Sequence, residues 1–239
     1  MHKTHTTMVQ EQASILVPGG SLLAAGMIIL GDQSPIILAA MTVPQLAVYL
    51  ILAYATGHLL QIFGTHIEGV CWKLHGGMPI DWVRQGGKGL LTEDQRLELA
   101  RQVQAKLGLP LPAGLEGLSK GQWYFVTRQL LAYVQGVGQP QQLHHLTGNY
   151  ELYRGIAASA LALAAGIAIY DPVPMLAMTN LDLYYIVLAL SAATLAAYQM
   201  ERYAVQYALE LFCQFIVAPG GVGADLVGRI PEAPPALVS

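Results

Sequence analysis

The sequence predicts an all-α integral membrane protein with four transmembrane helices, long cytoplasmic helix extensions and a small cytoplasmic helical cap. Two features of the composition indicate this fold class. Of the 239 residues, 54% are hydrophobic and only 11% are charged. Soluble domains carry roughly 25% charged residues. The chain therefore has too few polar side chains to cover a water-soluble globule, and its apolar residues gather in four long stretches.

Those four stretches approach the length of a bilayer span, which is about 20 largely apolar residues for a helix. The predicted spans cover residues 13–30, 35–55, 155–170 and 183–198. The third stretch is short, so the turn before it is expected to belong to the span as well. The first two spans are joined by Gly31-Asp32-Gln33-Ser34-Pro35, whose residue types are those of a tight turn.

Lysine and arginine lie on only one side of these spans. The connectors 31–35 and 171–174 contain none of the 12 basic residues, which all lie before the first span, between the second and third, or after the fourth. Because basic residues are retained on the cytoplasmic side, both termini and the middle segment are predicted to be cytoplasmic, in a cell membrane such as a bacterial inner membrane. The small net charge of −3 does not suggest a nucleic-acid partner.

The chain is expected to consist of five segments. They are a cytoplasmic N-terminal tail (1–12), a hairpin of the first two spans with a cytoplasmic extension (13–75), a cytoplasmic helical segment (76–140), a hairpin of the last two spans with extensions (141–217) and a flexible C-terminal tail (218–239).

Helical patterns continue beyond the predicted spans. Apolar side chains recur at three- and four-residue spacing after the second span until Gly76, and after the fourth span until Pro219. In the middle segment, Thr92 and Ser119 are each followed three residues later by glutamine, which is the pattern of a capping box at a helix start. Two short helices are therefore expected there, packed as a cap on the helix extensions.

Polar and ionisable residues gather where the second, third and fourth spans meet the cytoplasm. Ionisable groups near a bilayer are costly unless paired, so they are functional candidates by default. A structural belt of ion pairs is the first interpretation, and a ring lining a vestibule or a lipid-headgroup site is the alternative. The members of this interfacial polar layer are His58, Gln61, His66, Glu68, Arg154, Glu201, Arg202 and Glu210.

Small residues recur at four-residue spacing on the last two spans, which favours close packing of helices in lipid. These predicted helix-packing faces are Ala158, Ala162 and Gly166 on the third span, and Ala189, Ala193 and Ala197 on the fourth.

No catalytic, metal-binding or cofactor motif is recognisable. The histidines of the cytoplasmic zone form one adjacent pair and the other three are eight or nine residues apart, whereas pairs of metal ligands on a helix are usually about three or four residues apart. The glycine-rich stretch 76–89 contains Gly-Lys followed by Gly89, whereas a phosphate-binding loop requires serine or threonine there. Catalytic residues are therefore not assigned, and neither a metal nor a cofactor is expected.

Three functions fit these patterns. The first is a non-enzymatic, homo-oligomeric membrane module that acts as a pore, a membrane effector or a sensor coupled to the cytoplasmic segment. The second is a membrane enzyme that acts on a lipid-like substrate at the cytoplasmic interface, using His58, His66, Glu68, Arg154 or Glu201. The third is a membrane scaffold that anchors a cytosolic protein partner.

Overall fold

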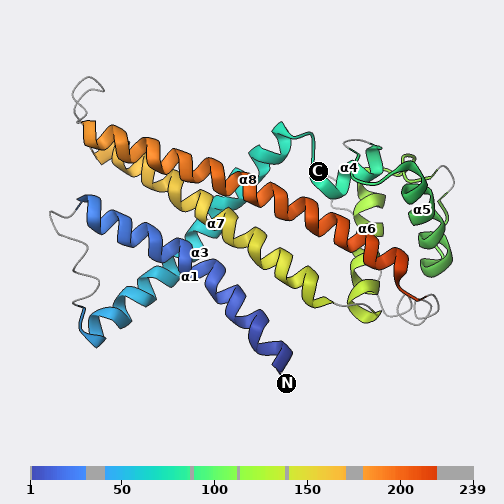
Figure 1. Ribbon diagram of the computed structural model, residues 1–239, viewed down its shortest axis with the longest axis horizontal. Coiled ribbons are helices and arrows are strands. Elements are labelled where there is room, and N and C mark those ends of the chain that lie inside the picture. The colour runs from blue at the N-terminus through green and yellow to red at the C-terminus, as the bar shows by residue number, and fades with distance from the viewer. Residues whose placement is uncertain are drawn as a thin grey trace, which may run out of the picture. The chain divides into compact units, whose positions relative to one another are not determined.

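The computed structural model describes residues 2–30, 41–86, 89–111, 114–137, 140–170 and 180–219, and every regular element in these ranges is an α-helix (Figure 1). The two connectors between the predicted spans lie outside the described residues, and so does the C-terminal segment after Pro219. The helices group into two compact units. The long-helix unit comprises Met1–Gly77 and His144–Ala204, and the short-helix unit comprises Met78–Leu143 and Val205–Ser239.

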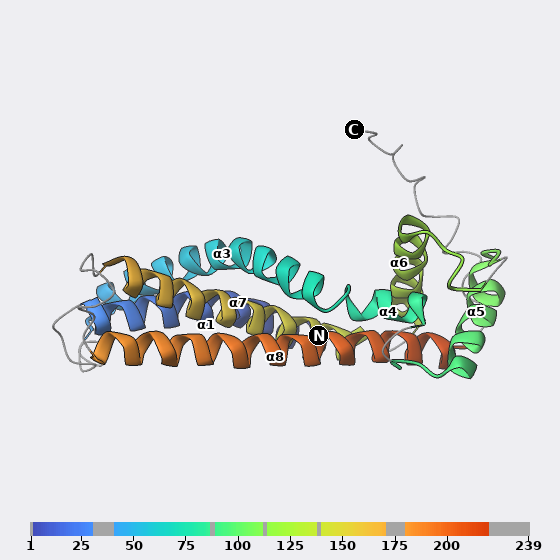
Figure 2. The same ribbon diagram turned by 90° about the horizontal axis from the view of Figure 1, so that it is seen from above.

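Four long helices contribute to the long-helix unit. They are α1 (His2–Leu30), α3 (Val43–Leu74), α7 (Pro140–Tyr170) and α8 (Asn180–Val217). Helix α1 starts at His2 and thus includes residues 2–12 of the predicted N-terminal tail. Helices α7 and α8 run alongside each other, whereas α1 crosses α3 (Figures 1 and 2).

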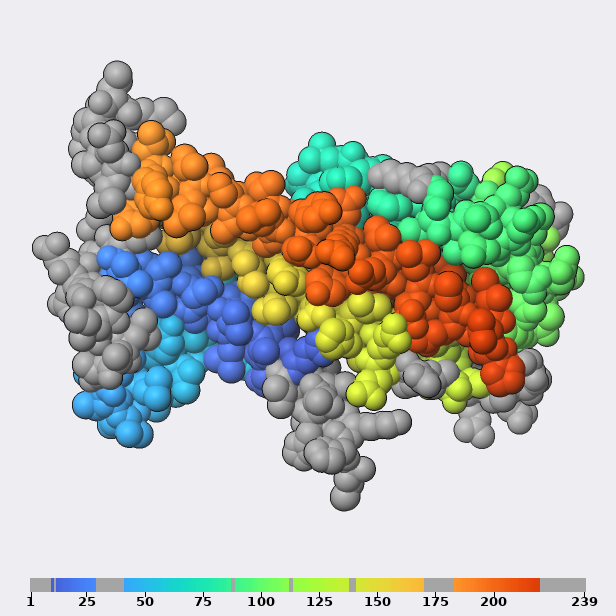
Figure 3. Space-filling view, viewed as in Figure 1, coloured from blue at the N-terminus to red at the C-terminus, as the bar shows by residue number. Residues whose placement is uncertain are grey.

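Three of these helices, α3, α7 and α8, are long and apolar enough to cross a membrane by length and composition. The apolar stretch of α1, Gln12–Ile28, is shorter. The structure thus confirms an all-helical chain with three candidate spans, and the first of the four predicted spans is not confirmed. Large apolar side chains are exposed along α3 and along the N-terminal part of α8, which is seen at the surface in Figure 3. Such a surface is suited to a hydrocarbon environment.

Glycines allow α1 and α3 to cross at backbone contact. A Cβ atom added to Gly19 would overlap the carbonyl oxygen of Ala53, and one added to Gly57 would overlap the carbonyl oxygen of Ile15. The buried ring of Pro18, on α1, lies over Gly155 of α7, where a Cβ would come within 2.6 Å of the proline Cγ. Residues without side chains thus bring three helices together at one level.

The short-helix unit contains α4 (Pro79–Gln85), α5 (Glu93–Leu107) and α6 (Lys120–Val137), together with the first turn of α7 and the last turns of α8. Both predicted capping boxes are confirmed. Gln95 N donates to Thr92 Oγ1 and Thr92 N donates to the Gln95 side chain, and the same exchange joins Ser119 and Gln122. Helix α5 ends at Gly108, whose φ of 65° is in the left-handed region that glycine tolerates.

Aromatic residues of α8 form part of the core of the short-helix unit. The Trp123 ring of α6 stacks on Phe212 with 6.0 Å between centroids, and Tyr133 meets Phe215 edge-on at 5.4 Å. Leu99 and other apolar residues of α5 complete this core. Because each fully buried aromatic or leucine side chain contributes roughly 1.5–3 kcal/mol, the last turns of α8 are an integral part of the unit.

A buried lysine caps the C-terminal end of α8. The Nζ of Lys106, on α5, donates hydrogen bonds to the carbonyl oxygens of Phe215 (2.6 Å), Ile216 (3.1 Å) and Ala218 (2.6 Å). These carbonyls have no partner within a helix that ends there. Burial lowers the pKa of the Lys106 ammonium, and the nearby Glu98 carboxylate acts in the opposite direction.

Candidate functional site

A buried ion pair joins α3 and α7 in the long-helix unit. Arg154 Nη1 on α7 donates to Glu68 Oε2 on α3 at 2.8 Å, and both side chains are largely buried, at 16% and 18% exposure. Arg154 Nη2 donates to Gln61 Oε1 at 2.7 Å. A buried pair of this kind costs free energy if either partner is lost, because the remaining charge is then desolvated without compensation.

Gln61 extends this network to a third helix. Its Nε2 donates to the Ser14 carbonyl oxygen of α1 at 2.9 Å, and more weakly to the Glu151 carbonyl oxygen of α7 at 3.5 Å. One amide side chain therefore joins α1, α3 and α7 through polar contacts. Ser14 is itself buried, so its carbonyl group depends on a donor from within the protein.

The local sequence makes room for the arginine. A Cβ atom at Gly64, one turn from Gln61 on α3, would lie 3.0 Å from Arg154 Cγ. The Arg154 Nε is buried without a hydrogen-bond partner among the described residues. The guanidinium is thus held by its two terminal nitrogens, with the glycine providing space for the aliphatic part of the side chain.

A tyrosine and a tryptophan flank the carboxylate. Trp72 Nε1 on α3 donates to the Tyr150 hydroxyl on α7 at 3.2 Å, and that hydroxyl also interacts with Glu68. Tyr153 of α7 stacks on Tyr203 of α8 with 5.5 Å between ring centroids. We call Gln61, Glu68, Tyr150 and Arg154 the Arg154 network.

A second polar contact joins α8 to the end of α3. His75 Nε2 lies 3.4 Å from Glu201 Oε2, and His75 Nδ1 lies 2.8 Å from the Cys71 carbonyl oxygen. Both side chains are partly exposed, at 42% and 31%. Two separate pairs thus exist in this region: Arg154 lies beside Glu68, and Glu201 lies beside His75.

The remaining members of the predicted polar layer lie elsewhere. His58 and His66 are exposed on α3, where His58 meets Tyr54 edge-on and His66 contacts the Ile62 carbonyl of its own helix. Arg202 is exposed on α8, and Glu210 belongs to the short-helix unit. Of the eight residues, only Gln61, Glu68 and Arg154 meet in one network.

The predicted packing faces are buried to different degrees. Ala158, Ala189 and Ala193 are buried, whereas Ala162 and Ala197 are partly exposed. Gly166 is exposed, and an added Cβ there would have nothing within 4 Å.

Sequence reasoning missed the residues that determine the closest contacts. Gly19, Gly57 and Gly155 make room at the crossing of α1, α3 and α7, and His75 and Lys106 each bind a group far away in the chain. The glycines lie inside long apolar stretches, where glycine is a signal of close helix approach. The partners of His75 and Lys106 carry no such local signal.

The Arg154 network joins three helices through polar contacts, and loss of either charge would leave its partner buried and unpaired. Within the described residues, no group of three or more histidine, cysteine, aspartate or glutamate side chains is placed to hold a metal ion. No protein-family model matches the chain, and neither the curated proteins nor the solved structures include one with significant similarity to it.

Proposed function

We propose that this protein is a homo-oligomeric membrane sensor or effector with four spans, in which the short-helix unit controls the packing of the membrane helices without a catalytic step. One observation carries the proposal. Helix α8 is unbroken from Asn180 to Val217, and it contributes to both compact units. A continuous helix can act as a mechanical link between them.

The two ends of α8 are adapted to different surroundings. Near its start, apolar side chains such as Leu183, Leu188 and Leu195 are exposed, the last at 66%. Near its end, Phe212 and Phe215 are fully buried among aromatic residues of α6. A ligand or partner that shifts the core around Phe212 would therefore act on the same continuous helix that presents these leucines.

In the proposed topology, α1 crosses the membrane in addition to α3, α7 and α8. Both termini and the short-helix unit are cytoplasmic. This orientation agrees with the confinement of all 12 basic residues to one side. Cys213, an exposed thiol in the short-helix unit, provides the test. In a Cys71→Ser background, a membrane-impermeant maleimide should label Cys213 in inverted vesicles and not in intact cells, and labelling in intact cells would refute the topology.

The hydroxyl groups on the lipid-facing part of α8 favour a sensor over a pore. Ser191 Oγ donates to the Val187 carbonyl oxygen at 2.7 Å, and Thr194 Oγ1 donates to that of Leu190 at 2.9 Å. Both exposed hydroxyl groups are thus satisfied within their own helix. They do not require a water-filled channel around them.

The positions of the histidines give no support to the enzyme alternative. That function needs His58 or His66 beside the Arg154 network. Both histidines are exposed on α3, and the side chains that accept hydrogen bonds from Arg154 are those of Gln61 and Glu68. The homo-oligomer is supported by Gly166, because this small residue is uncovered in a single chain and would allow a second helix to approach. Native mass spectrometry in nanodiscs measures the subunit number directly.

Coupling along α8 is tested with a spin label at residue 195, read by electron paramagnetic resonance in nanodiscs. Phe212→Ala, which opens the core of the short-helix unit, should change the mobility of this label. The double substitution Ala204→Gly and Val205→Gly, at the boundary between the units, should abolish that effect by making the helix flexible. A label at Leu46 on α3 is the control. If Phe212→Ala leaves the spectrum at residue 195 unchanged, α8 does not couple the units.

A further inference from the structure

An open hollow lies against the last turns of α8 in the short-helix unit. Its volume is about 410 Å³, and its apolar lining includes Val137 of α6, Val217 and Pro219. Pockets for small organic ligands have volumes of about 300–1,000 Å³ and combine an apolar lining with a few converging polar groups. This hollow is therefore large enough for a small organic molecule.

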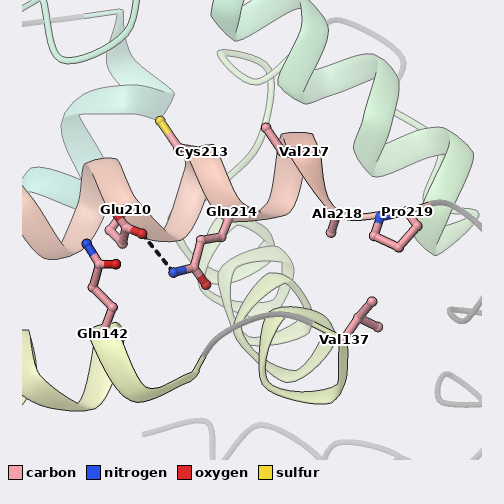
Figure 4. Close-up of a pocket in the computed structure, with 8 residues that line it drawn as sticks. All are labelled: Val137, Gln142, Glu210, Cys213, Gln214, Val217, Ala218 and Pro219. Carbon is pink, nitrogen blue, oxygen red and sulfur yellow. Dashed lines mark hydrogen bonds between the residues drawn. The ribbon is translucent and has the colours of Figure 1, made fainter.

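The polar groups of the hollow come from α7 and α8. Figure 4 shows Glu210 and Gln214 pointing from α8 toward the side where Gln142 and Val137 lie, whereas the Cys213 side chain points away. Cys213 lines the hollow from the other side of α8, as does Val217. A carboxylate and two amide groups remain as the polar part of the site.

Glu210 provides the carboxylate of the hollow. Among the described residues it forms no ion pair with lysine, arginine or histidine. It accepts a hydrogen bond from Gln214, whose Nε2 lies 2.8 Å from Glu210 Oε1. The ammonium group of Lys106, a residue of α5, lies at the C-terminal end of α8, where it donates hydrogen bonds to three carbonyl oxygens.

The amide oxygen of Gln214 also lacks a partner. Because its Nε2 donates to the carboxylate, the orientation of the amide is determined, and Oε1 must point elsewhere. That oxygen is buried without a hydrogen-bond donor among the described residues. An unsatisfied buried acceptor is unfavourable, and a bound donor would satisfy it.

From this combination we propose that the hollow binds a small organic cation, an amidinium, guanidinium or primary ammonium group attached to an apolar body. The cationic nitrogens would donate to Glu210 and to Gln214 Oε1, and the apolar body would lie on Val137, Ala218 and Pro219. This inference rests on the proposed sensor function, for which it names the class of ligand.

Other ligand classes fit less well. An anion would meet the Glu210 carboxylate with no basic side chain to offset it. A calcium ion takes about 6–8 oxygen ligands, and the side chains of Glu210, Gln142 and Gln214 supply too few. A cation with several N–H donors satisfies both acceptors at once.

Benzamidine and benzamide form a matched pair of probes, because they have the same shape and only benzamidine carries the charge. Binding of each to the full-length protein in nanodiscs is measured by saturation-transfer NMR and calorimetry. We expect benzamidine to bind roughly tenfold more tightly or better, as charge-assisted hydrogen bonds are about twice as strong as neutral ones. Equal affinity for the two probes, or no binding of benzamidine, would overturn the proposal.

The substitution Glu210→Gln removes the charge and keeps the shape of the side chain. Benzamidine affinity should then fall about tenfold, to that of benzamide. Glu93→Gln, which removes an exposed charge from α5, is the matched control and should leave the affinity unchanged. Unchanged binding to Glu210→Gln would exclude this hollow as the site. If that variant fails to fold, the comparison of the two probes on the wild type still decides the ligand class.

The result is separable from the test of the proposed function. Benzamidine binding depends only on the hollow, and the spin label at residue 195 reports only the coupling along α8. A protein that binds benzamidine without a change at residue 195 would keep the site and lose the sensor function. If the protein shows coupling but binds neither benzamidine nor benzamide, the proposed function is retained and the proposed site is refuted.

Discussion

The two compact units differ in the size of the apolar side chains that they bury. In the long-helix unit most buried apolar residues are alanines, such as Ala157, Ala158 and Ala193, while large apolar side chains are exposed. In the short-helix unit the buried residues are large, among them Trp123, Phe212 and many leucines and valines, and Ala208 is the one alanine among the buried residues described there. The same chain thus uses two different ways of packing.

The difference follows from the solvent that each unit is suited to. In water, burial of large apolar side chains drives folding. In lipid, burial of apolar area gives no such advantage, so helices associate through close backbone contact and polar groups. The glycine crossing of α1 and α3 and the Arg154 network provide both kinds of contact in the long-helix unit.

The largest effect is expected from Arg154→Met, which leaves Glu68 buried without its partner. Loss of one member of a buried pair costs roughly 3–5 kcal/mol. The double variant Glu68→Leu with Arg154→Met should lose much less than the sum of the single variants. Thermal unfolding in detergent and hydrogen exchange of α3 and α7 measure the effect.

Arg202→Met, which removes an exposed arginine of α8, is the control and should have little effect. If Arg154→Met were as mild as Arg202→Met, a polar tie would not be needed in the long-helix unit, and the contrast with the short-helix unit would be weaker.

Truncation of a large core residue should be most harmful in the short-helix unit. Phe215→Ala is expected to cost about 3–5 kcal/mol, because the side chain is fully buried and leaves a cavity. Hydrogen exchange of α5 and α6 reports this loss. Phe125→Ala, at a position 44% exposed on α6, is the matched control and should be close to neutral. Similar losses at both positions would mean that Phe125 is covered in the native state.

Addition of a single methyl group should be harmful in the long-helix unit. Gly57→Ala would place a Cβ on the Ile15 carbonyl oxygen, so α1 and α3 must separate. Overpacking of this kind costs about 1–3 kcal/mol. Gly69→Ala lies on the same helix with nothing within 4 Å of the added Cβ, and it should be neutral or stabilising. The stability of both variants is measured by thermal unfolding. If Gly57→Ala is as stable as the wild type, α1 and α3 are not in close backbone contact at this residue.

A smaller, pH-dependent effect is expected at Lys106. Burial lowers the pKa of this ammonium below its ordinary value of about 10.4, so the unfolded chain binds the proton more tightly. The unfavourable contribution is fully present below the folded pKa and disappears as the pH rises through the ordinary value. The stability of the wild type relative to Lys106→Met should therefore increase with alkaline pH.

The measurement is chemical unfolding of both proteins across the alkaline range, with exposed Lys120→Met as control. At neutral pH, Lys106→Met itself should cost roughly 1–3 kcal/mol, since three carbonyl groups lose their donor. A difference between wild type and Lys106→Met that shrinks as the pH rises would contradict the lowered pKa of Lys106.

Local features of the fold could be predicted from the sequence because they depend on residues within one or two turns. The capping boxes at Thr92 and Ser119 each involve residues three apart, and the end of α5 at Gly108 requires only a left-handed residue. The long apolar helices follow equally from composition. These features explain why an all-helical chain with membrane-type helices was predictable.

The candidate site was predictable only in part. That Gln61, Glu68 and Arg154 are polar residues near the ends of apolar stretches is evident from the sequence. That Arg154 pairs with Glu68 while Glu201 lies by His75, and that Glu210 belongs to the other unit, is not. That Gln214 Oε1 is buried without a hydrogen-bond donor among the described residues likewise becomes evident only from the tertiary structure.

The sequence by itself determined that the chain is helical and that several of its stretches are apolar enough for a membrane, because hydrogen bonding within a helix and transfer from water depend on local composition. It did not predict the short helix α4 or the helical conformation of residues 2–12. The tertiary structure alone decided which helix faces meet. That choice depends on contacts between residues far apart in the chain, such as Gly57 with Ile15 and Lys106 with the end of α8, where the room left by a missing side chain or the reach of a long one selects the partner.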